Sequence, residues 1–89
     1  MKYKLQLTKK AKNDFLGLQK AMQKRIAKKL KYYISNNNPL KYAKKLKDNR
    51  LGTYRFRIGD YRVIFDVDNK ANITILIILR VKHRKEVYL

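Results

Sequence analysis

The side chains in this sequence that could take part in chemistry are mostly cations in its second half. The ones that alternate along predicted strands or lie beside the single histidine are Arg55, Arg57, Arg62, Arg80, Lys82, His83 and Arg84. Guanidinium and ammonium groups bind phosphate oxygens and stabilise negative charge that develops in a reaction. Such chemistry requires that these side chains share one surface.

A predicted hairpin turn brings two of these cations together. Gly59 and Asp60 form a two-residue loop with glycine first, which indicates a type II′ turn. In that register Arg57 lies opposite Arg62, with Cβ atoms roughly 4.5–5.5 Å apart. Because like charges at such positions destabilise a sheet, the pairing predicts a bound anion, side chains that splay into water, or a different register.

Strand alternation adds further cations to this face. Arg55 lies two residues before Arg57, and Arg80 and Lys82 leave the end of the last strand with the same period. We call the expected surface, formed with Arg62, the cationic shelf, and we expect it to bind phosphate. A merely solvated strand face is the alternative, but such faces usually mix both signs of charge.

His83 is a candidate general base. It stands between Lys82 and Arg84, and neighbouring cations favour the neutral imidazole, which can accept a proton near pH 7. A surface histidine that caps the last turn of the chain is the other interpretation, and both stay open on composition alone.

Other chemistries lack the residues that they need. The chain has no cysteine, which removes disulfides, thiolate zinc sites and thiol nucleophiles. Asp66 and Asp68 share a strand face, but a two-metal site needs several convergent carboxylates and only six acidic residues are present, so we expect no metal. The three glycines match no nucleotide-binding pattern, and we expect no cofactor.

Without a metal to activate water, a nuclease would need a nucleophile from its substrate. RNA supplies one, because its 2′-hydroxyl can attack the adjacent phosphate in line. That reaction needs a base for the hydroxyl proton, cations for the phosphate charge and an acid for the leaving 5′-oxygen.

The composition of the chain favours a polyanionic partner. Its 24 basic and 6 acidic residues give a formal charge of +18, which nucleic acid or an acidic protein would neutralise. A hydrophobic content of 45% can build a core, and 89 residues suit a single domain, residues 1–89. The longest apolar run, Ile75 to Leu79, is far too short to span a membrane and no secretory signal is evident, so we expect a cytoplasmic protein without membrane contact.

The first half of the chain predicts one strand and two helices. Residues 2–7 alternate as a half-buried strand, and Thr8 is a suitable cap for a short helix. A longer amphipathic helix runs from about Lys20 to Ser35. The turn formers of 35–39 end it, and a further helical turn is expected from Pro39 through Ala43.

The second half predicts a three-stranded meander. Alternating strands cover about 54–58 and 61–67, a loose turn covers 68–72, and 73–80 is apolar on both faces, as in a central strand. Residues 82–89 form a short basic C-terminal segment. The predicted fold is α+β, in the order β-α-α-β-β-β, with two helices packed on a four-stranded, mostly antiparallel sheet.

Two segments of this sequence resemble the toxins of the RelE/ParE superfamily of type II toxin–antitoxin systems. They are LGTYRFRIGDYRVIFDV, residues 51–67, and VKHRKEVY, residues 81–88. The resemblance extends over nearly the whole chain in element order and length. It implies a RelE-like mRNA interferase, a metal-independent endoribonuclease that cleaves mRNA in the ribosomal A site and inhibits translation. It also implies an acidic, RelB-like antitoxin.

The resemblance assigns roles to the arginines of the hairpin. Arg62 corresponds to the family's phosphate-stabilising arginine. Arg55 and Arg57 stand where RelE has lysines, one of which is implicated in activating the 2′-hydroxyl. Because arginine stays protonated, it can stabilise charge there but is a poor base.

The resemblance also assigns roles near the carboxyl end. Lys82 takes the position of RelE's candidate acid, with Arg84 as an alternative, and Tyr88 matches a tyrosine that stacks on or orients a base. His83 matches a histidine of other interferase branches, so the role of the base is expected to move to His83.

Two other functions fit the same fold or composition. The ParE branch poisons DNA gyrase without cutting RNA, and a non-catalytic RNA- or ribosome-binding module is also compatible with the charge. The HRKEVY segment favours the ribonuclease branch, because it keeps a histidine, several cations and a terminal tyrosine together.

Overall fold

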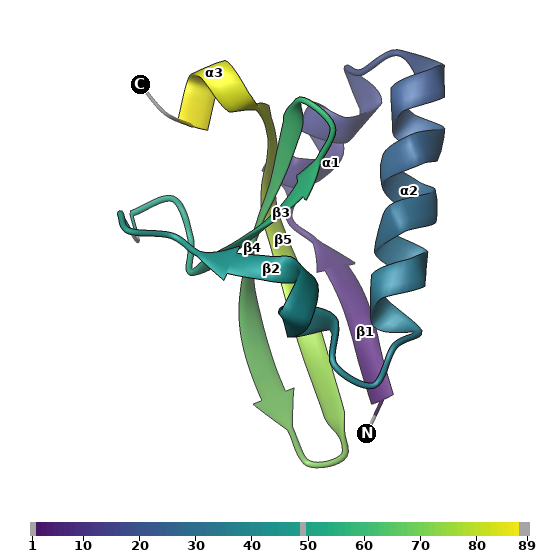
Figure 1. The fold of residues 1–89 in the computed structure, drawn as a ribbon, viewed down its shortest axis with the longest axis vertical. Coiled ribbons are helices and arrows are strands. Elements are labelled where there is room, and N and C mark those ends of the chain that lie inside the picture. The colour runs from purple at the N-terminus through teal and green to yellow at the C-terminus, as the bar shows by residue number, and fades with distance from the viewer. Residues whose placement is uncertain (1, 49, 88–89) are drawn as a thin grey trace.

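In the computed structural model, which describes residues 2–48 and 50–87, two helices cover one face of a five-stranded sheet (Figure 1). The sheet order is β1-β5-β4-β3-β2; β1 runs parallel to β5, and the other pairs are antiparallel. This confirms the predicted α+β class. The elements in chain order are β1 (Lys2–Leu7), α1 (Lys9–Leu16), α2 (Lys20–Ile34), the 3₁₀ turn η1 (Pro39–Tyr42), β2 (Ala43–Lys45), β3 (Tyr54–Ile58), β4 (Tyr61–Lys70), β5 (Ile73–His83) and α3 (Arg84–Val87).

The core lies between α2 and the sheet face that it covers. Tyr33 of α2 packs on Phe56 of β3 with ring centroids 4.6 Å apart, and Phe56 stacks on Phe65 of β4 at 4.4 Å. Ile26 and Leu30 of α2 are buried in the same cluster. The apolar faces predicted from strand alternation and from the helical period are confirmed, because they supply this core.

Thr8 caps α1 and fixes it to the sheet. Its hydroxyl accepts a hydrogen bond from the backbone amide of Ala11 at 3.1 Å and donates one to the carbonyl of Leu79 at 3.0 Å. The helix therefore begins where β1 ends and lies along the part of β5 that β1 leaves uncovered. This placement brings Asp14 of α1 within hydrogen-bond distance of Arg80.

The turn between β3 and β4 has the predicted form. Gly59 has a positive φ of 60° and Asp60 does not, as a type II′ turn requires. Arg57 pairs with Arg62 and Ile58 with Tyr61, so the predicted register is confirmed.

Three boundaries differ from the prediction. The last strand was expected to end at Arg80, but β5 extends to His83, so Lys82 and His83 belong to the strand and not to the C-terminal segment. The segment after η1 is not helical at Ala43, because residues 43–45 form β2, a fifth strand at the sheet edge. β2 has only three residues, two of them lysines, so its sequence shows no alternation of apolar and polar side chains. Lysines are typical of exposed edge strands. The expected loose turn at 68–72 is also wrong: β4 continues to Lys70, and Ala71 turns the chain with a φ of 45°.

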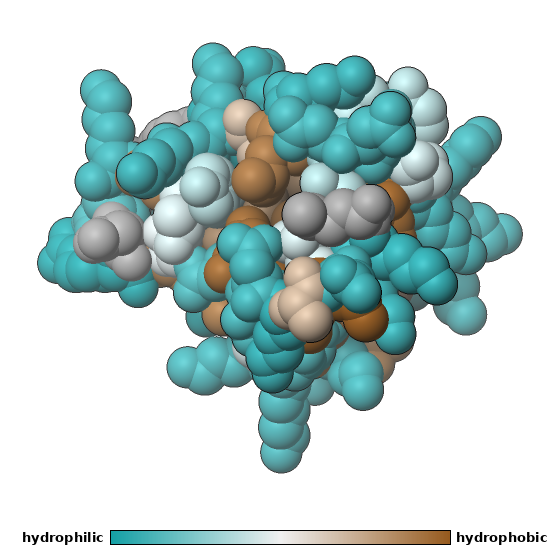
Figure 2. Space-filling model, turned by 90° about the horizontal axis from the view of Figure 1, so that it is seen from below, coloured by the Kyte–Doolittle hydropathy of each residue, from teal (hydrophilic) through white to brown (hydrophobic). Residues whose placement is uncertain are grey.

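Figure 2 shows the molecule from below, with hydrophilic side chains projecting around a smaller apolar area. Within residues 2–48 and 50–87, no helix combines the length and the apolar character needed to cross a membrane.

Candidate nucleic-acid interface

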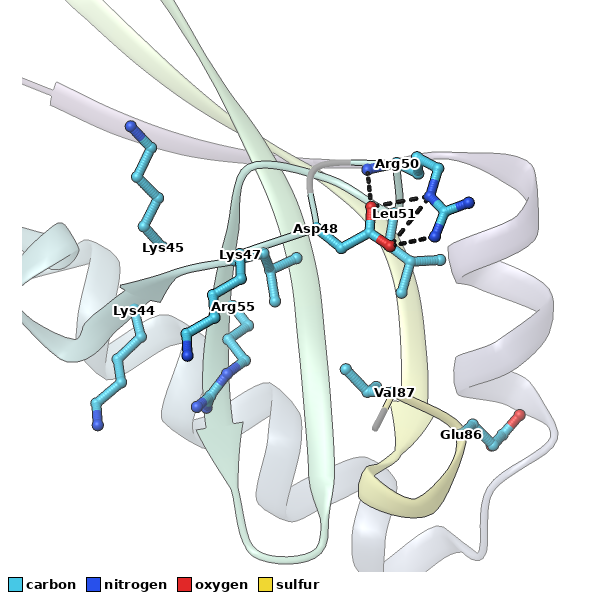
Figure 3. Close-up of a pocket in the computed structure, with 10 residues that line it drawn as sticks. Lys44, Lys45, Lys47, Asp48, Arg50, Leu51, Arg55, Glu86 and Val87 are labelled. Atoms are coloured by element: carbon cyan, nitrogen blue, oxygen red, sulfur yellow. Dashed lines mark hydrogen bonds and ion pairs between the residues drawn. The ribbon is translucent and has the colours of Figure 1, made fainter. Parts of the chain in front are cut away.

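A groove of about 870 Å³ lies between the β2–β3 connection and α3, on the sheet side opposite the long helices (Figures 1 and 3). This volume is within the usual range of ligand sites. We call residues 46–53, which connect β2 to β3, the basic loop. The side chains that line the groove come from β2, the basic loop, β3 and α3: Lys44, Lys45, Leu46, Lys47, Asp48, Arg50, Leu51, Arg55, Glu86 and Val87.

The basic loop passes so close to the sheet at Gly52 that a side chain there would have no room. A Cβ on Gly52 would stand 2.6 Å from Cγ2 of Ile64 and 3.0 Å from Cδ1 of Leu79. Next to it, the amide and the hydroxyl of Thr53 both donate to Asp66 Oδ1, at 2.9 and 2.8 Å. These contacts fix one wall of the groove.

The cations of the groove point largely in one direction. In Figure 3 the nitrogen atoms of Lys44, Lys47 and Arg55 lie on the same side, whereas Lys45 points away from them. The strands and the loop thus hold three positive charges on a short stretch of surface. Such an arrangement is suited to successive phosphates of a nucleic-acid strand.

Arg50 and Asp48 neutralise one another within the basic loop. Arg50 donates three side-chain hydrogen bonds to the Asp48 carboxylate, the shortest at 2.6 Å. These bonds, with one from the Arg50 amide, lower the pKa of Asp48 to about 2. The pair adds little net charge to the groove, although it shapes the loop.

α3 forms the opposite wall, and His83 caps it. The Lys85 amide donates to His83 Nδ1 at 3.2 Å, and the His83 amide donates to Glu86 Oε1 at 3.1 Å. Glu86 Oε2 also contacts Lys82 Nζ at 3.4 Å. The His83 amide and the Lys82 ammonium lower the pKa of the Glu86 carboxyl.

α3 is also attached to the β3–β4 turn. The Arg84 amide donates to the Asp60 carbonyl at 2.7 Å, and Arg84 Nε lies 3.7 Å from Asp60 Oδ1. The predicted alternative acid Arg84 is therefore paired with a carboxylate in this structure, as Lys82 is with Glu86.

Arg62 is not presented to solvent as the cationic shelf would require. Its side chain is only 3% exposed, and Nη1 donates to the carbonyls of Gly59 and Tyr61 at 3.2 and 3.0 Å. Arg57, its cross-strand partner, is exposed. The like-charge conflict is thus relieved because one guanidinium bonds to turn carbonyls while the other extends into water.

Arg80 also departs from the shelf. The β4–β5 register shifts so that Ile64 pairs with Arg80 while Phe65 pairs with Ile78. Arg80 Nε and Nη2 donate to the Asp14 carboxylate of α1 at 2.7 and 3.0 Å, and the Val81 amide donates to it at 3.0 Å. The Arg80 hydrogen bond is the largest cause that lowers the pKa of Asp14. Arg80 thus stays on the sheet face of Arg62 and Lys82, but its guanidinium is bound to a carboxylate of α1 and joins two elements.

His83 lies on the other face of the sheet from Arg62 and Lys82. It pairs with Tyr61, whose ring meets the imidazole edge-on at 5.3 Å and packs against the core. Pairs in an antiparallel ladder share a face, and Arg62 pairs with Lys82. The capping interpretation of His83 therefore describes its position, and the expected closeness to the shelf is not found. Tyr88 lies outside the described residues.

A family of known proteins matches almost the entire chain. Residues 5–88 match the ParE toxin of the type II toxin–antitoxin system parDE. The chain belongs to the RelE/ParE superfamily of toxins. A curated relative, toxin RelG of Mycobacterium tuberculosis, is 36% identical over 53 residues, which are 60% of this chain and 59% of RelG.

Solved structures similar to the toxin are complexes of RelE with RelB. The RelB–RelE complex of Methanococcus jannaschii matches with a TM-score of 0.67 and 29% identity over 93% of this chain and 94% of that one. The RelE–RelB complex of Pyrococcus horikoshii OT3 matches with a TM-score of 0.67 and 29% identity over 94% of this chain and 97% of that one. The RelBE2 complex of Mycobacterium tuberculosis matches with a TM-score of 0.63 and 26% identity over 94% of this chain and 100% of that one.

Sequence reasoning found Arg55 of the toxin's groove but missed β2 and the basic loop. Lys44, Lys45, Lys47 and Arg50 all line the groove, and residues 41–50 hold five of the cations. That density was a usable signal. Hydrophobic periodicity does not reveal these residues, because β2 has only three residues and the basic loop has no regular pattern.

The carboxylates of the toxin are already engaged. Each of the six acidic side chains contacts a cation, a hydroxyl or a backbone amide. Among residues 2–48 and 50–87, no three histidine or acidic side chains gather closely enough to hold a metal ion.

Proposed function

We propose that the toxin is a metal-independent endoribonuclease that cleaves mRNA on the ribosome and thereby inhibits translation. The observation that carries this proposal is the groove, in which Lys44, Lys47 and Arg55 are directed together by three different elements. A strand of RNA would lie along these cations with its phosphates paired to them. The relatives named RelG and RelE support the same branch of the superfamily.

The proposed reaction uses the 2′-hydroxyl of the RNA as nucleophile. Its oxygen attacks the adjacent phosphorus, its proton passes to an acceptor, and the 5′-oxygen leaves with a proton from a donor. A 2′,3′-cyclic phosphate remains. Arg55 and the exposed Arg57 would stabilise the negative charge of the transition state, since arginine stays protonated.

Roles for the other predicted residues follow from their contacts. Lys82, which contacts Glu86, would donate the proton to the 5′-oxygen, and Arg84, which contacts Asp60, is the alternative. Arg62 would reach the phosphate by exchanging its bonds to turn carbonyls for bonds to the substrate. Tyr88 would orient a base.

Inhibition of DNA gyrase is the second candidate function. The specific observation in its favour is that the matching family description names the ParE toxin. It would require the surface cations to engage a protein–DNA complex without cutting RNA.

The proposed partners are a RelB-like antitoxin and the ribosome, and with these partners the proposed location of the toxin is the cytoplasm. The similar solved structures are complexes with RelB. With a charge of +18, the toxin should bind an acidic antitoxin with an association rate that falls steeply as salt is added. Association that is indifferent to ionic strength would argue against an acidic partner.

Cell-free translation of a reporter mRNA distinguishes the functions. The purified toxin is added, RNA ends are mapped by primer extension, and gyrase supercoiling is assayed in parallel. Cut mRNA with active gyrase is expected. Intact mRNA with trapped gyrase–DNA complexes would establish the ParE-type function, and blocked translation with intact mRNA and active gyrase would establish a binding module.

A matched pair of variants assigns the activity to the groove. Lys44→Glu reverses a charge in the groove, and Lys28→Glu makes the same change on the exposed surface of α2. Cleavage should fall in the first variant and change little in the second. Equal losses would show that net charge, and not the groove, governs the activity.

A further inference from the structure

The contacts of His83 and Glu86 form a reciprocal capping box. In such a box the side chain of the N-cap residue accepts from an amide in the first helical turn, and the side chain of a glutamate three residues later accepts from the N-cap amide. His83 and Glu86 have this spacing and both bonds, at 3.2 and 3.1 Å. The histidine thus takes the place usually held by serine, threonine or aspartate.

This capping bond fixes the tautomer of the imidazole. A neutral histidine carries one proton, so a ring nitrogen that accepts a hydrogen bond leaves the proton on the other nitrogen. Because Nδ1 accepts from the Lys85 amide, the proton lies on Nε2. The ring therefore presents a donor at Nε2, and it could take up a second proton only at Nδ1, with loss of the cap.

The box also controls the groove. Glu86 and Val87, which line it, belong to the four-residue α3, and a helix of one turn depends on its caps. Glu86 in addition contacts Lys82, the proposed proton donor, at 3.4 Å. Loss of either side chain of the box would thus displace a wall of the groove and release Lys82.

We propose that His83 and Glu86 are positioning residues, which hold α3 and Lys82 in place for RNA, and that His83 is not the proton acceptor. The part that concerns RNA rests on the proposed function. The imidazole lies beside Tyr61, on the sheet face opposite Arg62 and Lys82, which agrees with this assignment. The acceptor of the 2′-hydroxyl proton is then a different group.

The first test needs no RNA. In ¹⁵N NMR spectra of the toxin, His83 Nδ1 should have the shift of an unprotonated ring nitrogen and Nε2 that of a protonated one. Hydrogen exchange of the Lys85 amide should be faster by about 3- to 30-fold in His83→Ala, the loss expected for a cap. Lys85→Ala is the control, because it removes a cation from the same turn but keeps the backbone donor. A proton on Nδ1, or unchanged exchange in His83→Ala, would overturn the capping assignment.

The second test separates positioning from base catalysis. Asparagine is a good N-cap that cannot act as a base, so His83→Asn should cleave RNA within about 3-fold of the parent while His83→Ala is slower. Glu86→Gln keeps an acceptor for the His83 amide, so this variant should cleave RNA faster than Glu86→Ala. If His83→Asn loses about 10²–10⁴-fold in kcat, as His83→Ala would for a removed base, the inference is wrong. If the parent cuts no RNA, the proposed function fails, and the NMR result still decides the capping assignment.

Discussion

Among single residues, Asp14 connects two distant parts of the chain. Its carboxylate holds Arg80 and the Val81 amide, so one acidic side chain joins α1 to the free edge of β5. The side chains of Arg80 and Asp14 are only 30% and 18% exposed, which limits screening by solvent. Removal of the carboxylate would leave a partly buried guanidinium without this partner.

Asp14→Ala should lower the free energy of unfolding by about 2 kcal/mol at pH 7. Because the folded-state pKa of Asp14 lies below its unfolded value, its contribution is present above the unfolded-state pKa and is lost as the pH falls through the folded-state pKa. Urea unfolding of both proteins between pH 7 and pH 2 measures this. Asp68→Ala, which breaks the exposed 3.7 Å pair with Lys70, is the control and should cost less than about 1 kcal/mol.

Ala71 has a backbone conformation that suits glycine better. Its φ of 45° is in the left-handed region, where a Cβ costs roughly 1 kcal/mol. Ala71→Gly should therefore stabilise the toxin by up to about 1 kcal/mol, whereas Ala27→Gly, within α2, should destabilise it by a similar amount. Thermal unfolding tests both, and a lower melting temperature for Ala71→Gly would contradict the expectation.

Sequence patterns located the charged residues better than they located their contacts. The register of Arg57 with Arg62 was predictable, because Gly59 fixes the turn. The ion pair of Arg80 was not, since its partner Asp14 lies on another element, 66 residues earlier in the chain. Strand alternation does predict that His83 and Lys82 lie on opposite faces of the sheet, because neighbouring residues of a strand point to opposite sides.

Among the elements, the basic loop has the greatest influence on the site. The spacing of apolar residues predicted α1 and α2. It also predicted β1, β3, β4 and β5, because an element that buries one face needs apolar residues at regular intervals. It could not predict β2 or the loop, whose position depends on a close approach at Gly52 and on the Thr53–Asp66 bonds. The Thr53–Asp66 bonds join residues that lie 13 positions apart.

Gly52→Ala should push the basic loop away from the sheet. The added Cβ would meet a side chain at 2.6 Å, so we expect a loss of about 1–3 kcal/mol in stability and slower RNA cleavage. Gly17→Ala is the matched control, because its Cβ would find its nearest neighbours at 3.5 Å. Denaturation and cleavage assays on both variants measure the effect, and equal behaviour would show that the loop tolerates a side chain.

At the scale of the whole molecule, the charge of +18 was the clearest signal in the sequence, but charge alone does not locate a site. α2 carries lysines and no acidic residue on the opposite side of the sheet from the groove. If the groove holds the RNA, only some of the cations contribute to its binding.

The salt dependence of RNA binding tests this division. The slope of log K against log salt should become shallower by about 0.7 in Lys44→Glu, which loses one phosphate contact to a single strand. Lys28→Glu should keep the slope of the parent. Fluorescence anisotropy with a labelled oligoribonucleotide, measured over a range of salt concentrations, gives both values, and identical slopes would place the RNA elsewhere.

Cleavage of an mRNA with one 2′-deoxy nucleotide immediately before the mapped cut tests the central claim most directly. The toxin and ribosomes are supplied with this RNA and with its all-ribose counterpart. Because the 2′-hydroxyl is the proposed nucleophile, the all-ribose RNA should be cut to a 2′,3′-cyclic phosphate or the 3′-phosphate derived from it, and the deoxy RNA should stay intact at that position. Equal cleavage of the two RNAs would contradict the account, since the nucleophile would then come from water or from the protein.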